Sequence, residues 1–367
     1  MIYYFITHFV SNFRDTPLRL IDYVSFRAGA AAMTAFLLVL FLGPFTVRTL
    51  KSLNAIAAGR YEDVAPELAN KLKNKTPSMG GILIVAAITA ALLLWGDLSN
   101  ALLQIFLAAT IGFSLLGFLD DYAKTALQKS DGISGKCKLF FQILITVVSL
   151  YFFNQLSETG DILQDLYVPF IKEPVYIMPL WMAFIFGTLV VTGSSNAVNL
   201  TDGKDGLAVG CVTFCTLAYT AFAYMTGHRI FADYLSLKYI QGAGEIAVFG
   251  CAIAGSCIGF LWHNCHPASM FMGDTGSLAL GGAVGLIAVL VKQEILLLLV
   301  GWVFVMEAGS VMLQVASYKL TKKRIFLCSP IHHHFEKKGW PETQIVVRFW
   351  IIAGVCALLG LATLKLR

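Results

Sequence analysis

Residues 100–124 read NALLQIFLAATIGFSLLGFLDDYAK, an apolar run that ends in two adjacent acids. A helix needs roughly 20 predominantly apolar residues to cross the hydrocarbon core of a bilayer. The first part of the stretch meets that length, and Asp120 and Asp121 follow where such a helix would leave the lipid. The stretch therefore predicts a membrane helix with a charged end.

The same pattern recurs along the chain. Of its 367 residues 57% are hydrophobic and only 13% charged, and the mean hydropathy is +0.73, whereas a soluble domain needs far more charge on its surface. Ten predicted spans cover residues 28–50, 80–96, 100–119, 138–156, 176–195, 206–226, 244–262, 276–292, 294–317 and 345–364. The sequence predicts an all-α, polytopic integral membrane protein, with one transmembrane domain over residues 1–367.

Positive charge is distributed unevenly between the two sides of this predicted bundle. The loops that follow the odd-numbered spans, with their flanking residues, hold 18 of the 27 Lys and Arg residues. Short cytoplasmic loops of membrane proteins carry this excess, so the odd loops are predicted to be cytoplasmic and both termini periplasmic. Sidedness also accounts for the net charge of +5, and nucleic-acid binding is not predicted.

Polar residues of chemical interest gather in the same odd-numbered loops. They are Asp120 and Asp121 after the third span, Asn196, Asn199, Asp202 and Asp205 after the fifth, Asn264 and Asp274 after the seventh, and His332, His333 and His334 after the ninth. Ionisable groups at a membrane are costly and usually functional. One shared site at the cytoplasmic face explains why these clusters occur in alternate loops.

The acids predict a metal. Adjacent carboxylates repel each other, and a divalent cation or a shared proton relieves the repulsion. Because the sequence has no Cys/His zinc spacing, the oxygen donors favour Mg²⁺. Asp202 and Asp205 are spaced i, i+3 and are predicted to share one helical face. Simpler interpretations remain open: a helix leaving the bilayer, an Asx-type turn at Asp202, and an N-cap at Asp274.

Basic segments lie beside the acids. Lysines and hydroxyls in residues 71–81 precede a predicted helix start, where backbone amides and the helix dipole favour phosphate. The loop after the third span carries Lys124, Lys129, Lys136 and Lys138, and the histidine run lies in a strongly basic loop that could equally be a positive-inside anchor. Together these residues predict phosphate chemistry with a metal at a membrane surface.

Five segments resemble the polyprenyl-phosphate N-acetylhexosamine-1-phosphate transferase superfamily (glycosyltransferase family 4). They are Thr76–Gly81, Gly117–Lys124, Asn196–Gly206, Asn264–Gly276 and Pro330–Glu336, in family order across residues 70–340. The run PIHHHFE at 330–336 and the following KGWPE at 338–342 resemble the muramoyl-pentapeptide branch of that superfamily.

The resemblance implies a reaction and a set of roles. UDP-N-acetylmuramoyl-pentapeptide and undecaprenyl phosphate would give lipid I and UMP with Mg²⁺, in a bacterial inner membrane. Asp274 resembles the principal Mg²⁺ ligand, and Asp120 and Asp121 resemble the acidic pair at the reacting phosphates, with Asp120 favoured as the base. The other implied roles are catalytic imidazoles at His332, His333 and His334, polar cleft positions at Lys73, Ser78, Lys124 and Lys136, and a nucleotide side at Asn196, Asn199, Asp202, Asp205, Asn264 and Phe271.

The sequence departs from the family pattern at three positions. Lys204 stands where an apolar residue is expected, Lys75 where Gly is expected, and Ser78 where Thr is expected. The alternatives left open are a sibling enzyme that loads N-acetylglucosamine-1-phosphate, a secondary transporter and an assembly scaffold. A homodimer, and the choice between direct attack and a covalent aspartyl intermediate, are also left open.

Overall fold

The computed structural model describes the chain except for residues 11–12, 54, 56–75, 126–131, 157–160 and 367. Its N-terminal half contains α1 Ile2–Phe9, η1 Phe13–Asp15, η2 Pro17–Asp22, α2 Val24–Ser52, α4 Gly81–Trp95, α5 Ala101–Thr125, α6 Gly135–Gln155, η3 Asp161–Gln164, β1 Asp165–Leu166, β2 Tyr176–Ile177 and α7 Leu180–Thr201. The rest contains α8 Leu207–Thr226, α9 Arg229–Tyr234, α10 Ala243–Asn264, α11 Gly273–Leu290, α12 Leu297–Val300, α13 Trp302–Thr321, α14 Ile331–Lys337, α15 Glu342–Ala362 and η4 Thr363–Lys365. The short strands β1 and β2 form one antiparallel pair.

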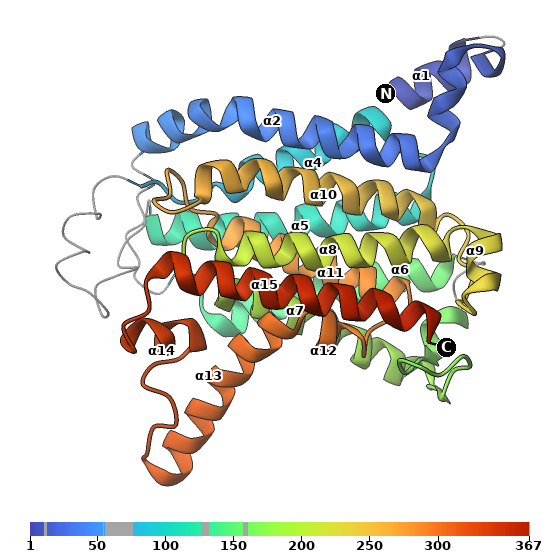
Figure 1. Cartoon of the computed structure of the whole chain (residues 1–367). Helices are drawn as coiled ribbons and strands as arrows, with labels where there is room; N and C mark the ends of the chain where they lie inside the picture. The colour runs from blue at the N-terminus through green and yellow to red at the C-terminus, as the bar shows by residue number, and fades with distance from the viewer. Residues whose placement is uncertain (11–12, 54, 56–75, 126–131, 157–160, 367) are drawn as a thin grey trace.

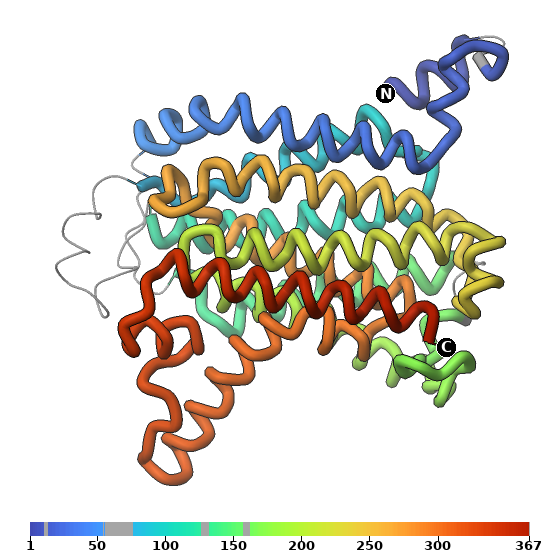
Figure 2. The backbone as a smooth tube through the Cα atoms, in the orientation of Figure 1, coloured from blue at the N-terminus to red at the C-terminus, as the bar shows by residue number. Residues whose placement is uncertain are grey.

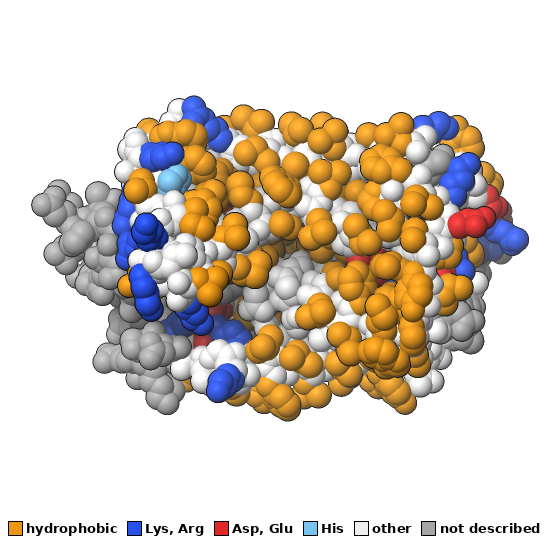
Figure 3. All heavy atoms as spheres, turned by 90° about the horizontal axis from the view of Figure 1, so that it is seen from below, with side chains coloured by type: hydrophobic (Ala, Val, Ile, Leu, Met, Phe, Trp, Pro, Cys, Tyr) orange, Lys and Arg blue, Asp and Glu red, His pale blue; other side chains and the backbone are white. Residues whose placement is uncertain are grey.

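The long helices lie side by side around α11 (Figure 1). Almost all of α11 is buried, and it packs most extensively against α5 and α7, while α10 packs against α2 and α8. Helices at the outside instead expose large apolar side chains, such as Phe41 and Phe45 of α2 and Ile351 of α15. Figure 3 shows one such face, with hydrophobic side chains over its middle and charged side chains towards the two ends. This surface fits a bilayer.

Within the described residues, eight helices are long and apolar enough to span a membrane. They are α2, α5, α6, α7, α8, α10, α11 and the helix that begins at Glu342 and runs to Lys365. The predicted span at 80–96 corresponds to α4, an apolar helix of 15 residues that is shorter than the others.

The prediction of one continuous helix over 294–317 is wrong. The chain breaks at Gly301, which has φ −91° and ψ 21° and separates α12 from α13. Figure 2 shows that α13 then leaves the bundle at a steep angle. A sliding average of hydropathy misses this break, because the apolar character continues through it.

The two termini lie at the same end of the bundle, and α14 lies at the opposite end (Figure 1). At this opposite end α5, α7 and α10 finish and α11 begins, so these helix ends bring the acids and amides predicted to form one site to one end of the molecule.

Candidate active site

A close contact between α5 and the start of α11 creates the site. A Cβ atom built on Gly117 of α5 would lie 2.2 Å from the carbonyl oxygen of Asp274, so only glycine permits this approach. One turn later α5 carries Asp120 and Asp121, which are 0% and 5% exposed. Residues that are about 150 positions apart in the sequence thereby become neighbours.

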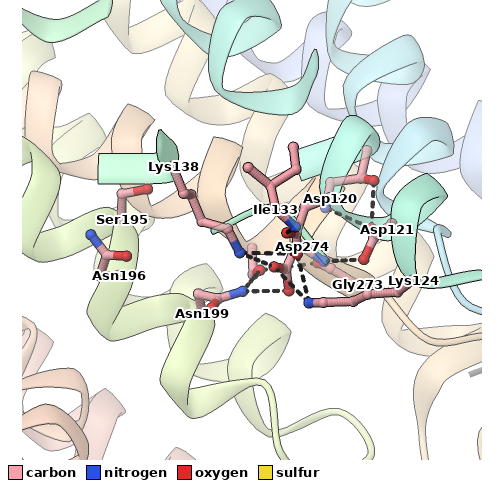
Figure 4. A network of polar contacts seen from close by, with 12 residues as sticks. Asp120, Asp121, Lys124, Ile133, Lys138, Ser195, Asn196, Asn199, Gly273 and Asp274 are labelled. Carbon is pink, nitrogen blue, oxygen red and sulfur yellow. Dashed lines mark hydrogen bonds and ion pairs between the residues drawn. The ribbon is translucent and has the colours of Figure 1, made fainter. Parts of the chain in front are cut away.

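Asp120 and Asp274 share two lysines (Figure 4). Lys138 Nζ lies 2.9 Å from Asp120 Oδ2 and 2.6 Å from Asp274 Oδ2, and Lys124 Nζ lies 2.6 Å and 3.2 Å from the same two oxygens. The backbone N–H of Ile133 donates to Asp120 Oδ1 at 2.8 Å. Two carboxylates thus converge on one point, and their charge is balanced by two ammonium groups.

Asp121 has a different role from its neighbour. Its Oδ1 accepts a hydrogen bond from the N–H of Asp274 (3.1 Å), and its Oδ2 accepts from the N–H (2.9 Å) and hydroxyl (2.6 Å) of Thr275. These are free N–H groups of the first turn of α11, so Asp121 caps that helix from α5. It orients the backbone that carries Asp274.

The family resemblance gives a cleft role to Lys136, but the lysine of this loop that reaches the acids from α6 is Lys138. The side chain of Ser134 caps α6, the helix starts at Gly135, and in that register Lys136 is exposed while Lys138 points to the acids. A signal was present in the sequence: Lys138, Gln142 and Thr146 are polar residues spaced four apart, which marks the inward face of an amphipathic helix.

Asn196 and Asn199 lie inside α7, not in the loop after it, because α7 continues to Thr201. Asn199 Nδ2 donates to Asp274 Oδ1 and to Ser277 Oγ, both at 2.8 Å. Asn196 Nδ2 donates instead to Gln142 Oε1 of α6 at 2.9 Å, and Figure 4 shows it apart from the acids. Of these two asparagines, Asn199 is the one that contacts Asp274.

Asp202 and Asp205 do not share a helical face, so that prediction is wrong. Asp202 is the C-cap that follows α7, and Asp205 lies in the turn that leads to Gly206, whose φ is +75°. Asp205 is 6% exposed, and its Oδ2 lies 3.1 Å from His266 Nδ1 and accepts from the N–H of Ala268 at 3.1 Å. Asp205, His266 and Glu342 each offer one atom that could coordinate a metal ion, and these three atoms lie within 4.8 Å of one another. This is a second polar cluster.

The remaining nucleotide-side residues are mostly buried in loop contacts. Asn264 is 2% exposed, and it accepts from the N–H of Gly206 (3.0 Å) and donates to the carbonyl of Met270 (2.9 Å). Phe271 is 8% exposed, and its backbone pairs with Pro77 and Gly80. Of the predicted cleft positions, Ser78 lies beside Gly273, and Lys73 lies outside the described residues.

The three histidines occupy three environments. His332 is buried, with Nδ1 3.0 Å from Glu307 Oε2 of α13. His333 Nδ1 lies 2.9 Å from Glu336 Oε2, and His334 Nδ1 accepts from the N–H of Leu327 at 3.1 Å. Partial burial and the nearby Lys338 lower the pKa of His334. The run therefore does not present three equivalent imidazoles.

The fold and this cluster define a class, a multi-pass helical membrane protein with an oxygen-rich, lysine-balanced site at one end of the bundle. The model for glycosyl transferase family 4 matches residues 103–292, and residues 73–85 match signature 1 of the phospho-N-acetylmuramoyl-pentapeptide-transferases.

Curated relatives match over nearly the whole chain, and each is named a phospho-N-acetylmuramoyl-pentapeptide-transferase. Those of Koribacter versatilis (46% identity, 96% of each chain), Desulfotalea psychrophila (49%, 94% of each chain) and Neisseria gonorrhoeae (46%, 96% of this chain and 97% of the relative) are examples. The chain belongs to glycosyl transferase family 4, among its phospho-N-acetylmuramoyl-pentapeptide-transferases, and is a transferase.

Proposed function

We propose that the protein transfers phospho-N-acetylmuramoyl-pentapeptide from its UDP carrier to undecaprenyl phosphate, giving lipid I and UMP. The observation that carries this proposal is the convergence of Asp120 and Asp274 between Lys124 and Lys138. The reaction joins two phosphate-bearing substrates, so it needs cations near the phosphates and a carboxylate that can accept the proton of the acceptor phosphate. We assign that last role to Asp120.

The donor set fits Mg²⁺. Asp120 and Asp274 turn carboxylate oxygens to one point, and the side-chain amide nitrogen of Asn199 steadies the other oxygen of Asp274. Mg²⁺ is commonly held by one or two carboxylates together with substrate phosphates, whose charge it neutralises. Asp274 and Asp120 would hold the ion directly through the Oδ2 atoms that face the two lysines, whereas the oxygens of Asp121 face the first turn of α11 and accept its N–H groups.

An apolar groove supports a polyprenyl acceptor. It has about 340 Å³ of space and runs between α7 and the broken α12–α13 segment, with Leu189, Val190 and Ala197 among its lining residues. Ala197 lies two positions before Asn199, which contacts Asp274. A lipid chain seated along α7 would therefore bring its phosphate to the end of the bundle where the acids lie.

The sidedness of the chain follows from the same proposal. The UDP carrier is a soluble cytoplasmic metabolite, so the end with Asp120 and Asp274 faces the cytoplasm and both termini face the periplasm of a bacterial inner membrane. Counting α4 and the α12–α13 segment as spans completes the ten crossings. The excess of Lys and Arg in the odd-numbered loops supports this orientation.

The test is UMP release by purified protein in detergent with Mg²⁺, undecaprenyl phosphate and either of two donors. We expect release with UDP-N-acetylmuramoyl-pentapeptide and none with UDP-N-acetylglucosamine. Release with the second donor alone would assign the chain to the sibling activity, and release with neither would reject the transferase.

A further inference from the structure

Lys204 is buried completely in the turn between α7 and α8, with 0% of its side chain exposed. A lysine is almost never buried to this extent unless it is paired, because desolvation of the ammonium is costly. Lys204 Nζ contacts Glu336 Oε1 of α14, and it lies 3.8 Å from Glu342 Oε2 at the start of α15. The lysine thus joins three separate elements.

Glu336 divides its two oxygens between Lys204 and a histidine. Its Oε1 faces Lys204, and its Oε2 lies 2.9 Å from His333 Nδ1. Burial acts to raise the pKa of Glu336, but hydrogen bonds from His333 and Lys204 outweigh it and hold the pKa at about 2. The residue is therefore a carboxylate at neutral pH. Because it contacts both Lys204 and His333, a shift of Lys204 would also shift His333.

Glu342 completes the connection to the nucleotide side. Its Oε1 accepts the backbone N–H of Asp205 at 3.0 Å, next to Lys204 in the chain. Asp205 in turn lies 3.1 Å from His266 of the α10–α11 loop. The turn that carries Asp202 and Asp205 is therefore bound to α14 by the ion pair of Lys204 with Glu336, and not by apolar packing alone.

We infer that Lys204 is a positioning residue that holds α14 against the α7–α8 turn and thereby fixes the orientation of His333. This inference rests on the proposed function for its kinetic readout only. Burial and ion pairing distinguish Lys204 from the basic residues between α13 and α14. Lys322, for example, is exposed and lies over the ring of Tyr318.

The effect of removing the ammonium follows from these contacts. In Lys204→Met, two partly exposed carboxylates lose the buried cation that they share, and the repulsion left between them favours separation of α14 from the turn. Misplacement of a catalytic group by about 1 Å costs on the order of 100-fold in rate, so we expect kcat to fall by about 10- to 100-fold. KM for the nucleotide should change far less, because the role that the family resemblance implies for His333 is that of a catalytic imidazole.

The first experiment compares Lys204→Met, Lys204→Arg and the control Lys322→Met by UMP release. Lys204→Arg keeps the charge and should recover most of the lost kcat, and the control should match the wild type. In a His333→Asn background, Lys204→Met should cause little further loss, since both changes act through one imidazole. An equal additional loss in that background, or full activity of Lys204→Met alone, would overturn the inference.

A second experiment does not depend on turnover. Amide hydrogen exchange of residues 331–337 should accelerate in Lys204→Met and in Glu336→Gln, but not in Lys322→Met, while exchange within α11 stays unchanged. Unchanged protection of α14 would refute the positioning role even if the chain showed no transferase activity. If Lys204→Met does not fold, Glu336→Gln removes the same ion pair from the other side with an isosteric side chain.

Discussion

Replacing Lys138 by methionine removes an ammonium that contacts both converging acids, Asp120 and Asp274. Lys138 Nζ lies 2.9 Å from Asp120 Oδ2 and 2.6 Å from Asp274 Oδ2, while Lys124 continues to contact the same two oxygens. A hydrogen bond to a charged group contributes about 1.5–3 kcal/mol. Because Lys124 compensates part of the lost charge, we count one such interaction, not two. This corresponds to a fall in kcat/KM of about 10- to 150-fold.

The matched control is Lys136→Met, two residues earlier on α6 and exposed to solvent. Its kcat/KM should stay within about twofold of the wild type, since surface substitutions away from a site have small effects. The assay is initial-rate UMP release over a series of nucleotide concentrations at saturating lipid and Mg²⁺. Equal losses in the two variants, or a larger loss in Lys136→Met, would show that the register of α6 and the acid–lysine cluster have been assigned incorrectly.

Three further predictions concern the acids and the close helix contact. Removing Mg²⁺ with EDTA should abolish UMP release and adding Mg²⁺ back should restore it, whereas Asp274→Asn should stay inactive at every Mg²⁺ concentration with a wild-type Tm; turnover without divalent cations would contradict the proposed metal. Asp121→Ala removes the cap of α11, so the free energy of unfolding should fall by about 0.5–2 kcal/mol in thermal or denaturant unfolding; an unchanged value would argue against capping. Gly117→Ala should lower both Tm and kcat because its Cβ would lie 2.2 Å from the carbonyl oxygen of Asp274, while Gly112→Ala on the same helix, whose Cβ has 3.4 Å to the side chain of Ile145, should be tolerated in both assays.

The convergence of distant segments could be predicted from the sequence because it depends on coarse physics. Apolar runs must cross the lipid, and charge that is expensive to bury collects where the runs end. Alternating the ends of the spans therefore places Asp120, Asn199 and Asp274 at one end of the bundle from the sequence alone. The contacts of Asp274 with Lys124, Lys138 and Asn199 agree with that assignment.

The finer assignments depend on helix register and loop geometry, which composition does not determine. The choice of Lys136 over Lys138 turned on where α6 begins, and a shift of two residues rotates a side chain by more than half a turn. Asp202 and Asp205 were predicted on one helical face, but both lie in the turn between α7 and α8, outside either helix. Asn264 resembles a ligand-binding amide in the sequence, yet both of its polar atoms are used within the protein.

Asp120 and Asp121 are adjacent because the two carboxylates serve different partners. Successive residues of a helix point about 100° apart, so one carboxylate can cap α11 while the other faces the lysines. The cap fixes the first turn of α11, and that turn carries Asp274. Asp121 thus determines where Asp274 meets Asp120, and Gly117 sets how close the two helices come. A single turn of α5 both builds the site and contributes one of its two converging acids, which explains why a repulsive pair of neighbouring carboxylates is useful at this position.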